Sequence, residues 1–251
     1  MSTLRPIVLT IAGLDPTGGA GTLADIKTLE NHRVLGLAVI TANTIQTEEN
    51  VLTVSWEKQA FVVQQLSALL NRYKPDVVKI GIIPNSKDLL LYINLIKDKY
   101  PTTKIVWDPV FKATGAFEFT DNIEKKTLLQ ILNQIDIITP NYLEIHDLVQ
   151  TNEDAIEKAR ELSQYCTVVL KGGHNENALG FDYLIHKQNI QTFAPKKLSD
   201  YPKHGSGCVL SSAIAANLAL GEPIEYAMYN AKRYMEKYLE SNHTLLGYHA
   251  I

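Results

Sequence analysis

A short glycine-rich segment that ends in a cysteine is the part of the chain best equipped for chemistry. It runs directly into the apolar stretch 209–220, and it consists of Gly205, Ser206, Gly207 and Cys208. Backbone N–H groups in the first turn of a helix have no intrahelical partner, and the helix dipole adds partial positive charge there. Such a terminus binds anions, most often phosphate. It also favours a thiolate, so we expect the pKa of Cys208 to lie below the ordinary value of about 8.5.

A second glycine cluster lies near the N-terminus. It spans Gly13 to Gly21 and opens another predicted helix. The two clusters are separated by most of the chain, so the fold has to bring them together if they serve one site. The chain contains neither the G-x-x-x-x-G-K-[ST] sequence of Walker-type enzymes nor the G-x-G-x-x-G sequence of Rossmann dehydrogenases, and it is predicted to belong to neither class.

The elements that must position these clusters alternate between short apolar runs and amphipathic stretches. The predicted strands are 7–12, 37–42, 76–80, 105–107, 135–139 and 167–170, followed by a hairpin of 181–186 and 190–193. The predicted helices include 59–73, 87–100, 154–165, 208–220 and 225–240. This alternation favours an α/β fold with a mostly parallel central sheet, helices on both faces and the antiparallel hairpin toward one edge. No linker or repeat interrupts the pattern, which predicts one domain over residues 1–251.

Local signals add detail to two of these helices. We expect the helix at 59–73 to turn Phe61, Leu66, Leu69 and Leu70 toward the core. We also expect Ser86 to cap the N-terminus of the helix at 87–100, because a serine hydroxyl accepts hydrogen bonds from the unpaired N–H groups there.

Glycines and polar residues follow every predicted parallel strand. They occupy 13–16, 44–46, 81–82, 108–110, 139–141 and 171–173. Parallel sheets bind ligands at the carboxyl ends of their strands. Six such ends predict one binding site along that edge of the sheet.

Composition excludes several other classes of protein. The 251 residues are 45% apolar and carry a formal net charge of −3 without a basic run, so no nucleic-acid surface is expected. The two cysteines, Cys166 and Cys208, form neither a disulfide framework nor a metal-spaced set. The apolar run at 7–12 is too short for a signal peptide or a membrane span. We expect a soluble, cytoplasmic protein that does not act at a membrane.

An ordered set of motifs resembles the hydroxymethylpyrimidine/phosphomethylpyrimidine kinases of thiamine biosynthesis, which belong to the ribokinase-like superfamily. The motifs follow the family's order from residue 7 to about 220, and only the ordered set is specific. They are Ile11-Ala12-Gly13-x-Asp15-Pro16-x-Gly18-Gly19-Ala20-Gly21, Ala24-Asp25-x-Lys27-Thr28, Val39-Ile40-Thr41-Ala42, Lys79-Ile80-Gly81, Asp108-Pro109-Val110, Thr139-Pro140-Asn141-x-x-Glu144, Lys171-Gly172-Gly173-His174 and His204-Gly205-x-Gly207-Cys208. The resemblance implies a three-layer α/β/α kinase fold.

The resemblance also implies roles for residues that bind the acceptor substrate and transfer the phosphoryl group. Substrate would be bound by Gly13, Asp25, Gln46 and Val110. A primary amide such as that of Gln46 donates and accepts side by side, which suits an aminopyrimidine edge. Gly205, Ser206 and Gly207 would form an anion hole for the transferring group, and Cys208 would accept the proton of the substrate hydroxyl.

Asn141 and Lys171 would bind ATP, and Asp108 and Glu144 would organise Mg²⁺, mainly through water. The residues alone leave a structural alternative open for each of three of them. Asn141 also suits a turn after a proline, Glu144 the first turn of a helix, and Lys171 solvent at a strand end. A homodimer is expected from the resemblance alone.

The expected activity is ATP-dependent phosphorylation of the hydroxymethyl group of 4-amino-5-hydroxymethyl-2-methylpyrimidine, and of its monophosphate to the diphosphate. The alternative is a pyridoxal or pyridoxamine kinase, whose substrate also carries a hydroxymethyl group on a flat heteroaromatic ring. Two other classes stay open. Cys208 and His204 could serve as nucleophile and base in acyl transfer, or the chain could be a ligand-binding domain without catalysis.

Overall fold

The computed structural model describes residues 5–111, 123–175 and 178–249. Its strands are β1 (Ile7–Leu14), β2 (Leu35–Gln46), β3 (Val51–Trp56), β4 (Val77–Ile80), β5 (Lys104–Trp107), β6 (Ile137–Ile138), β7 (Thr167–Leu170), β8 (Asp182–His186) and β9 (Asn189–Phe193). Its helices are α1 (Gly21–Asn31), α2 (Gln59–Arg72), α3 (Ser86–Lys99), α4 (Lys125–Leu132), α5 (Glu144–Leu148), α6 (Ala155–Leu162), α7 (Ser206–Ala219) and α8 (Ile224–Leu239), with a 3₁₀ turn at Gly172–His174.

All the described strands belong to one sheet, in the order β3-β2-β1-β4-β5-β6-β7-β8-β9. The stretch from β2 through β7 pairs in parallel, and the β8–β9 hairpin continues the sheet antiparallel at one edge. The mostly parallel sheet and the edge hairpin are therefore confirmed. The single domain over residues 1–251 stays a prediction from the sequence.

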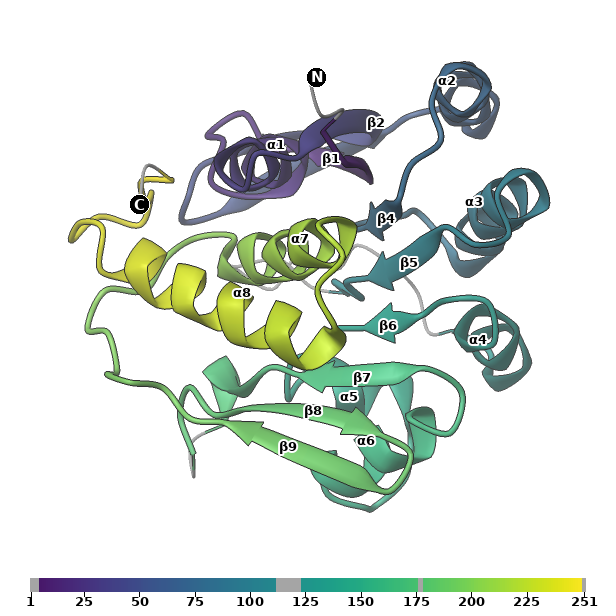
Figure 1. Ribbon diagram of the computed structural model, residues 1–251. Helices are drawn as coiled ribbons and strands as arrows, with labels where there is room; N and C mark the ends of the chain where they lie inside the picture. The colour runs from purple at the N-terminus through teal and green to yellow at the C-terminus, as the bar shows by residue number, and fades with distance from the viewer. Residues whose placement is uncertain (1–4, 112–122, 176–177, 250–251) are drawn as a thin grey trace.

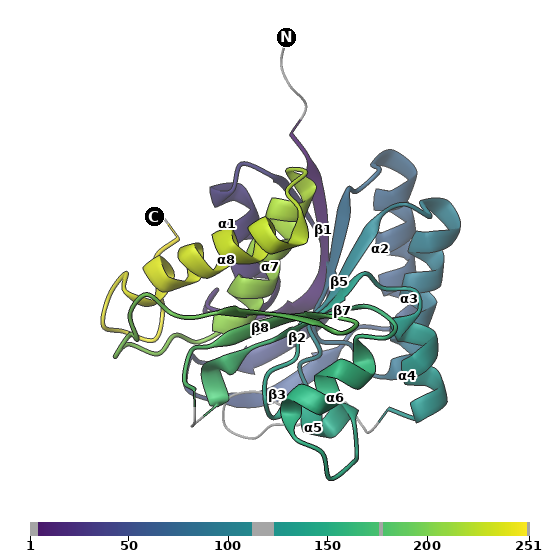
Figure 2. The same cartoon turned by 60° about the horizontal axis from the view of Figure 1, so that its bottom comes forward.

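Helices cover both faces of the sheet (Figure 1). Viewed from the side, α1, α7 and α8 lie on one face and α2, α3 and α4 on the other (Figure 2). Two apolar clusters fill the layers. The first, on the α2–α4 side, contains Leu66, Tyr92 and Ile131. The second, on the α7–α8 side, contains Ile214 and Tyr238. This is the three-layer arrangement that the resemblance implies.

Helix α7 is buried along nearly its whole length. Every residue from 209 to 218 is buried, which is the position expected of a helix that is apolar on all sides. Because α1, α8 and the sheet enclose α7, its N-terminal turn is held at a fixed place relative to the strands. None of the helices in the described ranges is long and apolar enough to cross a membrane.

The structure also corrects the sequence reading at three places. A strand that the sequence did not predict, β3, pairs antiparallel with β2, so residues 47–50 form the turn of a second hairpin. Phe61 does not face the core, since it is 51% exposed. The N-cap of α3 is Asn85, whose side chain accepts the Asp88 N–H, and not Ser86, which is already inside the helix.

Candidate active site

The two glycine clusters touch each other at the start of α7. Gly205 is the N-cap residue and has a left-handed backbone with φ of 71°. A Cβ atom on Gly205 would lie 2.1 Å from the carbonyl oxygen of Gly19 and 2.6 Å from the Cα of Ala20. Only glycine adopts this conformation readily and leaves room for so close an approach. The expectation that the fold brings the two clusters together is confirmed.

Asp15 and His204 join the clusters a second time through their side chains. His204 Nε2 lies 2.9 Å from Asp15 Oδ2, and the backbone N–H groups of Thr17 and Ala20 donate to the same carboxylate at 2.8 Å. Burial alone would raise the pKa of Asp15, but these hydrogen bonds lower it to about 2. The carboxylate therefore stays charged and fixes both loops. The sequence assigned His204 a role only in the acyl-transfer alternative, as a base for Cys208.

Cys208 lies in the first turn of α7 and is partly exposed. The Gly21 N–H at the start of α1 hydrogen-bonds its sulfur. The prediction of a lowered thiol pKa is nevertheless wrong. Burial raises the pKa of Cys208 to about 11, and the carboxylates of Asp25 and Asp108 act in the same direction against the ammonium group of Lys79. The loss of solvation on burial outweighs the stabilisation of the thiolate by the positive end of the helix dipole.

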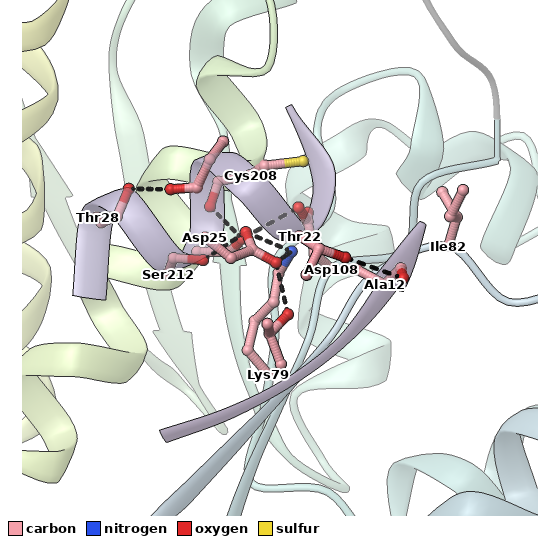
Figure 3. Close-up of polar contacts among 12 residues, drawn as sticks. Ala12, Thr22, Asp25, Thr28, Lys79, Ile82, Asp108, Cys208 and Ser212 are labelled. Carbon is pink, nitrogen blue, oxygen red and sulfur yellow. Dashed lines mark hydrogen bonds and ion pairs between the residues drawn. The ribbon is translucent and has the colours of Figure 1, made fainter. Parts of the chain in front are cut away.

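Asp25 is fully buried. Its carboxylate accepts hydrogen bonds from Lys79 Nζ at 3.0 Å to both oxygens, from Thr10 Oγ1 at 2.5 Å and from Ser212 Oγ at 2.7 Å. Figure 3 shows Asp25, Lys79 and Ser212 pointing toward one another, with Cys208 nearby. The predicted direct contact between Asp25 and a substrate is therefore not supported by this placement.

Lys171, Asp108, Glu144 and Asn141 form one cluster at the ends of β5, β6 and β7. Lys171 Nζ lies 2.6 Å from Asp108 Oδ1 and 3.6 Å from Glu144 Oε2. Glu144 Oε2 accepts the Asn141 N–H at 2.6 Å, and Asn141 Oδ1 accepts the Glu144 N–H at 2.9 Å. Burial, and after it the proximity of Asp108, raises the pKa of Glu144 to about 7, although Lys171 opposes this. The structure thus groups all four residues assigned to ATP and metal.

These residues fit a magnesium ion only in part. Among the residues that the structure describes, no three histidine, cysteine, aspartate or glutamate side chains gather as a metal-binding group. Asp108 already binds Lys171, Thr139 Oγ1 at 3.0 Å and Ser211 Oγ at 3.1 Å. A direct bond from Asp108 to a metal would displace these partners. Glu144 is the carboxylate better placed to reach a hydrated ion, which suits the preference of Mg²⁺ for keeping water ligands.

The remaining substrate candidates are more dispersed. Gln46 is the last residue of β2 and is half-buried, and the strand end is tied to the first cluster because Thr44 Oγ1 donates to the Leu14 carbonyl at 2.9 Å. Gly13 packs against Ile82, whose Cδ1 would lie 2.4 Å from an added Cβ. Val110 lines a small cavity together with Gly81, Trp107, Pro109 and Phe111. Neither Gly13 nor Gln46 lines that cavity, so the structure does not bring the three into one described pocket.

Sequence reasoning missed Lys79 as a site residue. It lies in the four-residue strand β4 among apolar neighbours, is fully buried and forms an ion pair with Asp25. A lysine inside an otherwise apolar strand was an available signal, because a buried ammonium group requires a partner of opposite charge. The buried position of Asp25 on α1 supplies that partner.

Comparisons with known proteins agree with this geometry. A curated hydroxymethylpyrimidine/phosphomethylpyrimidine kinase of Staphylococcus aureus is 32% identical over 91% of this chain and 86% of its own length. Its counterpart in Aquifex aeolicus is 31% identical over 95% and 96%.

Two solved structures share the fold. A phosphomethylpyrimidine kinase of Clostridium difficile has a TM-score of 0.76 at 29% identity, covering 93% of this chain and 99% of its own. An ADP complex of Bacillus subtilis pyridoxal kinase has a TM-score of 0.80 at 27% identity, covering 94% and 92%. The family model described as phosphomethylpyrimidine kinase matches residues 15–250. With the two glycine clusters joined around Cys208, this chain belongs to the phosphomethylpyrimidine kinase family.

Proposed function

We propose that this chain uses ATP to phosphorylate the hydroxymethyl group of 4-amino-5-hydroxymethyl-2-methylpyrimidine, and then phosphorylates the monophosphate to the diphosphate. The observation that carries the proposal is the junction of the two glycine clusters at Cys208, within a chain that matches the phosphomethylpyrimidine kinase family from residue 15 to 250. Curated relatives named for both phosphorylation steps support the two-step assignment.

The residues around the start of α7 suit phosphoryl transfer. The N–H groups of Ser206, Gly207 and Cys208 have no intrahelical acceptor, so they can receive the negative charge of the γ-phosphate. Lys171 Nζ lies 3.2 Å from the position of a Cβ on Gly207, which places its ammonium charge beside the same turn. Such fixed donors stabilise the charge that develops during transfer.

Cys208 is the group we assign to proton removal. In the transfer step the substrate O–H bond breaks and the proton passes to the Cys208 thiolate, which becomes a neutral thiol. The oxygen forms a bond to the γ-phosphorus while the bond from that phosphorus to ADP breaks. Asp25 is not available for this task, because all its hydrogen-bond partners are internal.

Magnesium would neutralise phosphate charge when bound. Glu144 would hold it through water, and Asn141 orients Glu144 because each accepts an N–H of the other. Lys171 would keep Asp108 charged beside the nucleotide phosphates.

Gln46 is proposed to recognise the aminopyrimidine edge, with Gly13 and Val110 beside the ring. The test is to incubate the protein with Mg·ATP and a panel of hydroxymethyl heteroaromatics that includes the pyrimidine, its monophosphate, pyridoxal and pyridoxamine. We expect turnover of the two pyrimidines. The Gln46→Leu variant should then lose about tenfold or more in affinity for the pyrimidine, because the ring's polar edge loses its partners. Faster turnover of pyridoxal than of either pyrimidine would contradict the proposal.

We also propose that the chain is a homodimer that pairs near the β2–β3 edge of the sheet. Ile45 and Leu52 lie on this hairpin with exposed fractions of 61% and 69%, and exposed apolar side chains on an edge hairpin favour association. A cytoplasmic location stays a prediction from the sequence.

A further inference from the structure

A buried ion pair lies beneath the proposed catalytic thiol and is not explained by the binding of either substrate. Lys79 lies on β4, directly next to the central strand β5, and Asp25 lies on α1. Both residues are fully buried. We propose that Lys79 is a positioning residue that supplies the compensating positive charge when Cys208 becomes a thiolate, while Asp25 holds Lys79 in place and limits its effect. This inference rests on the proposed function, in which Cys208 is the proton acceptor.

Asp25 is built to hold the lysine. Each of its two carboxylate oxygens accepts one bond from Lys79 Nζ, at 3.0 Å. Oδ1 also accepts Ser212 Oγ, and Oδ2 also accepts Thr10 Oγ1. With two donors on each oxygen, the carboxylate has no capacity left for a substrate or a proton. Its remaining use is to fix the position of Lys79.

The same contacts tie the pair to the thiol. Ser212 follows Cys208 by four residues on α7, and residues four apart lie on the same side of a helix. The side of α7 that presents Ser212 to Asp25 therefore also presents Cys208 one turn closer to the N-terminus. Figure 3 shows Lys79 and Asp25 next to this side of the helix, with the Cys208 sulfur at its end.

The charged groups around Cys208 come from four elements. They are Lys79 on β4, Asp25 on α1, Asp108 after β5 and Lys171 after β7. Asp108 and Lys171 bind each other at 2.6 Å, so their charges largely offset one another at the thiol. Lys79 has a larger effect on the pKa of Cys208 than either carboxylate has, and it lowers that pKa, which favours the thiolate. The buried lysine is thus the cation whose removal should matter most.

The test is the pH dependence of Cys208 alkylation by iodoacetamide in the full-length protein without substrates, with peptide mapping to separate Cys208 from Cys166. Lys79→Met should slow alkylation of Cys208 at pH 8 by about tenfold or more, because an opposite charge near a group typically shifts its titration by one pH unit or more. Asp25→Asn leaves the lysine unopposed and should speed alkylation by a similar factor. The two variants remove the same ion pair but are expected to act in opposite directions.

A purely structural role predicts a different outcome. Loss of the pair would then loosen the site in both variants and shift alkylation in the same direction, or leave it unchanged, and either result would overturn the proposal. The double variant Lys79→Met/Asp25→Asn removes both charges, so it guards against misfolding of a variant with one unpaired buried charge. Its alkylation rate should fall between those of the two single variants. Ser212→Ala is the neutral control, since it removes one hydrogen bond to Asp25 and no charge.

Turnover supplies a second readout. In the plot of kcat against pH, the rise on the acidic side should move to higher pH in Lys79→Met, and the KM for ATP should be unchanged. If the protein phosphorylates neither pyrimidine, the proposed function fails, but the alkylation results still decide whether Lys79 compensates the thiolate.

Discussion

Replacement of Gly205 by alanine tests whether contact between the two glycine clusters holds the site together. The residue has φ of 71°, and an added Cβ would lie 2.1 Å from the Gly19 carbonyl oxygen. The left-handed backbone alone costs an alanine about 1–2 kcal/mol. The neighbour is main chain and cannot rotate away, so the first cluster has to move. We expect the free energy of unfolding to fall by about 3 kcal/mol or more, a value typical of strain at a special backbone position.

Gly221 is the matched control for the backbone cost. It also has positive φ, of 90°, but nothing lies within 4 Å of its Cβ position. Gly221→Ala should therefore lose only about 1–2 kcal/mol and keep its kinase activity. Urea denaturation of both variants gives the two free energies, and a coupled assay of ADP release gives kcat.

The difference between the two variants isolates the clash. Gly205→Ala should also lower kcat by about 10²-fold or more, because displacement of the N–H groups of an anion hole removes stabilisation of that order. If Gly205→Ala is no less stable than Gly221→Ala and turns over normally, then contact between the clusters does not position the site, and the reasoning is refuted.

Three further predictions concern the thiol, the buried glutamate and the edge hairpin. Cys208→Ala should lower kcat by about 10²–10⁴-fold with ATP binding nearly intact, and wild-type activity in this variant would remove the thiol from catalysis. Because burial raises the pKa of Cys208 to about 11, wild-type kcat should rise between pH 7 and 9, whereas Cys208→Asp should give a flat profile. The pKa of Glu144 is raised in the folded state from 4.5 to about 7, so its contribution to stability is full below pH 4.5 and is lost as the pH rises through 7. Between these pH values the free energy of unfolding of Glu144→Gln, measured by urea denaturation, should therefore rise relative to wild type by up to about 3 kcal/mol. A difference that does not depend on pH would contradict this. Light scattering should give twice the 28.0 kDa chain mass for wild type and the monomer mass for Ile45→Asp/Leu52→Asp, and a monomeric wild type at micromolar concentration would exclude the dimer.

The architecture could be predicted from the sequence because the parallel strands are short, apolar and separated by clear helical patterns. β3 was missed although Leu52 and Val54 alternate with polar residues, which is the period of a strand. The strand lies at the edge of the sheet and none of its residues is buried, so it lacks the continuous apolar run that marks the central strands. Phe61 was placed in the core by helical spacing, yet the side of α2 that carries it is exposed. Spacing gives the angle between side chains, but it does not give the direction of the sheet.

The sequence predicted which residues form the candidate site better than it predicted their pKa values and charge partners. The residues around Lys171 come together because strand ends meet at one edge of a parallel sheet. The pKa of Cys208 could not be predicted, since it depends on solvent exclusion by α1 and on Asp25 and Asp108, which are distant in the sequence. The role of Asp25 depended on Lys79 for the same reason. Lys79 in an apolar strand signals that a buried partner of opposite charge is needed. No local sequence pattern identifies Asp25 as that partner, because the pairing is set by tertiary packing.

The contact of His204 with Asp15 joins residues that are 189 positions apart. A nascent or truncated chain that ends before α7 therefore lacks one wall of the anion site, however well its earlier strands have paired. Because such distant segments meet late in folding, a phosphate-bearing ligand should recognise only the completely folded chain. It should then stabilise the chain against global unfolding by RT ln(1 + [L]/Kd), and it should protect the strands near the N-terminus from hydrogen exchange as strongly as the helix that carries the cysteine.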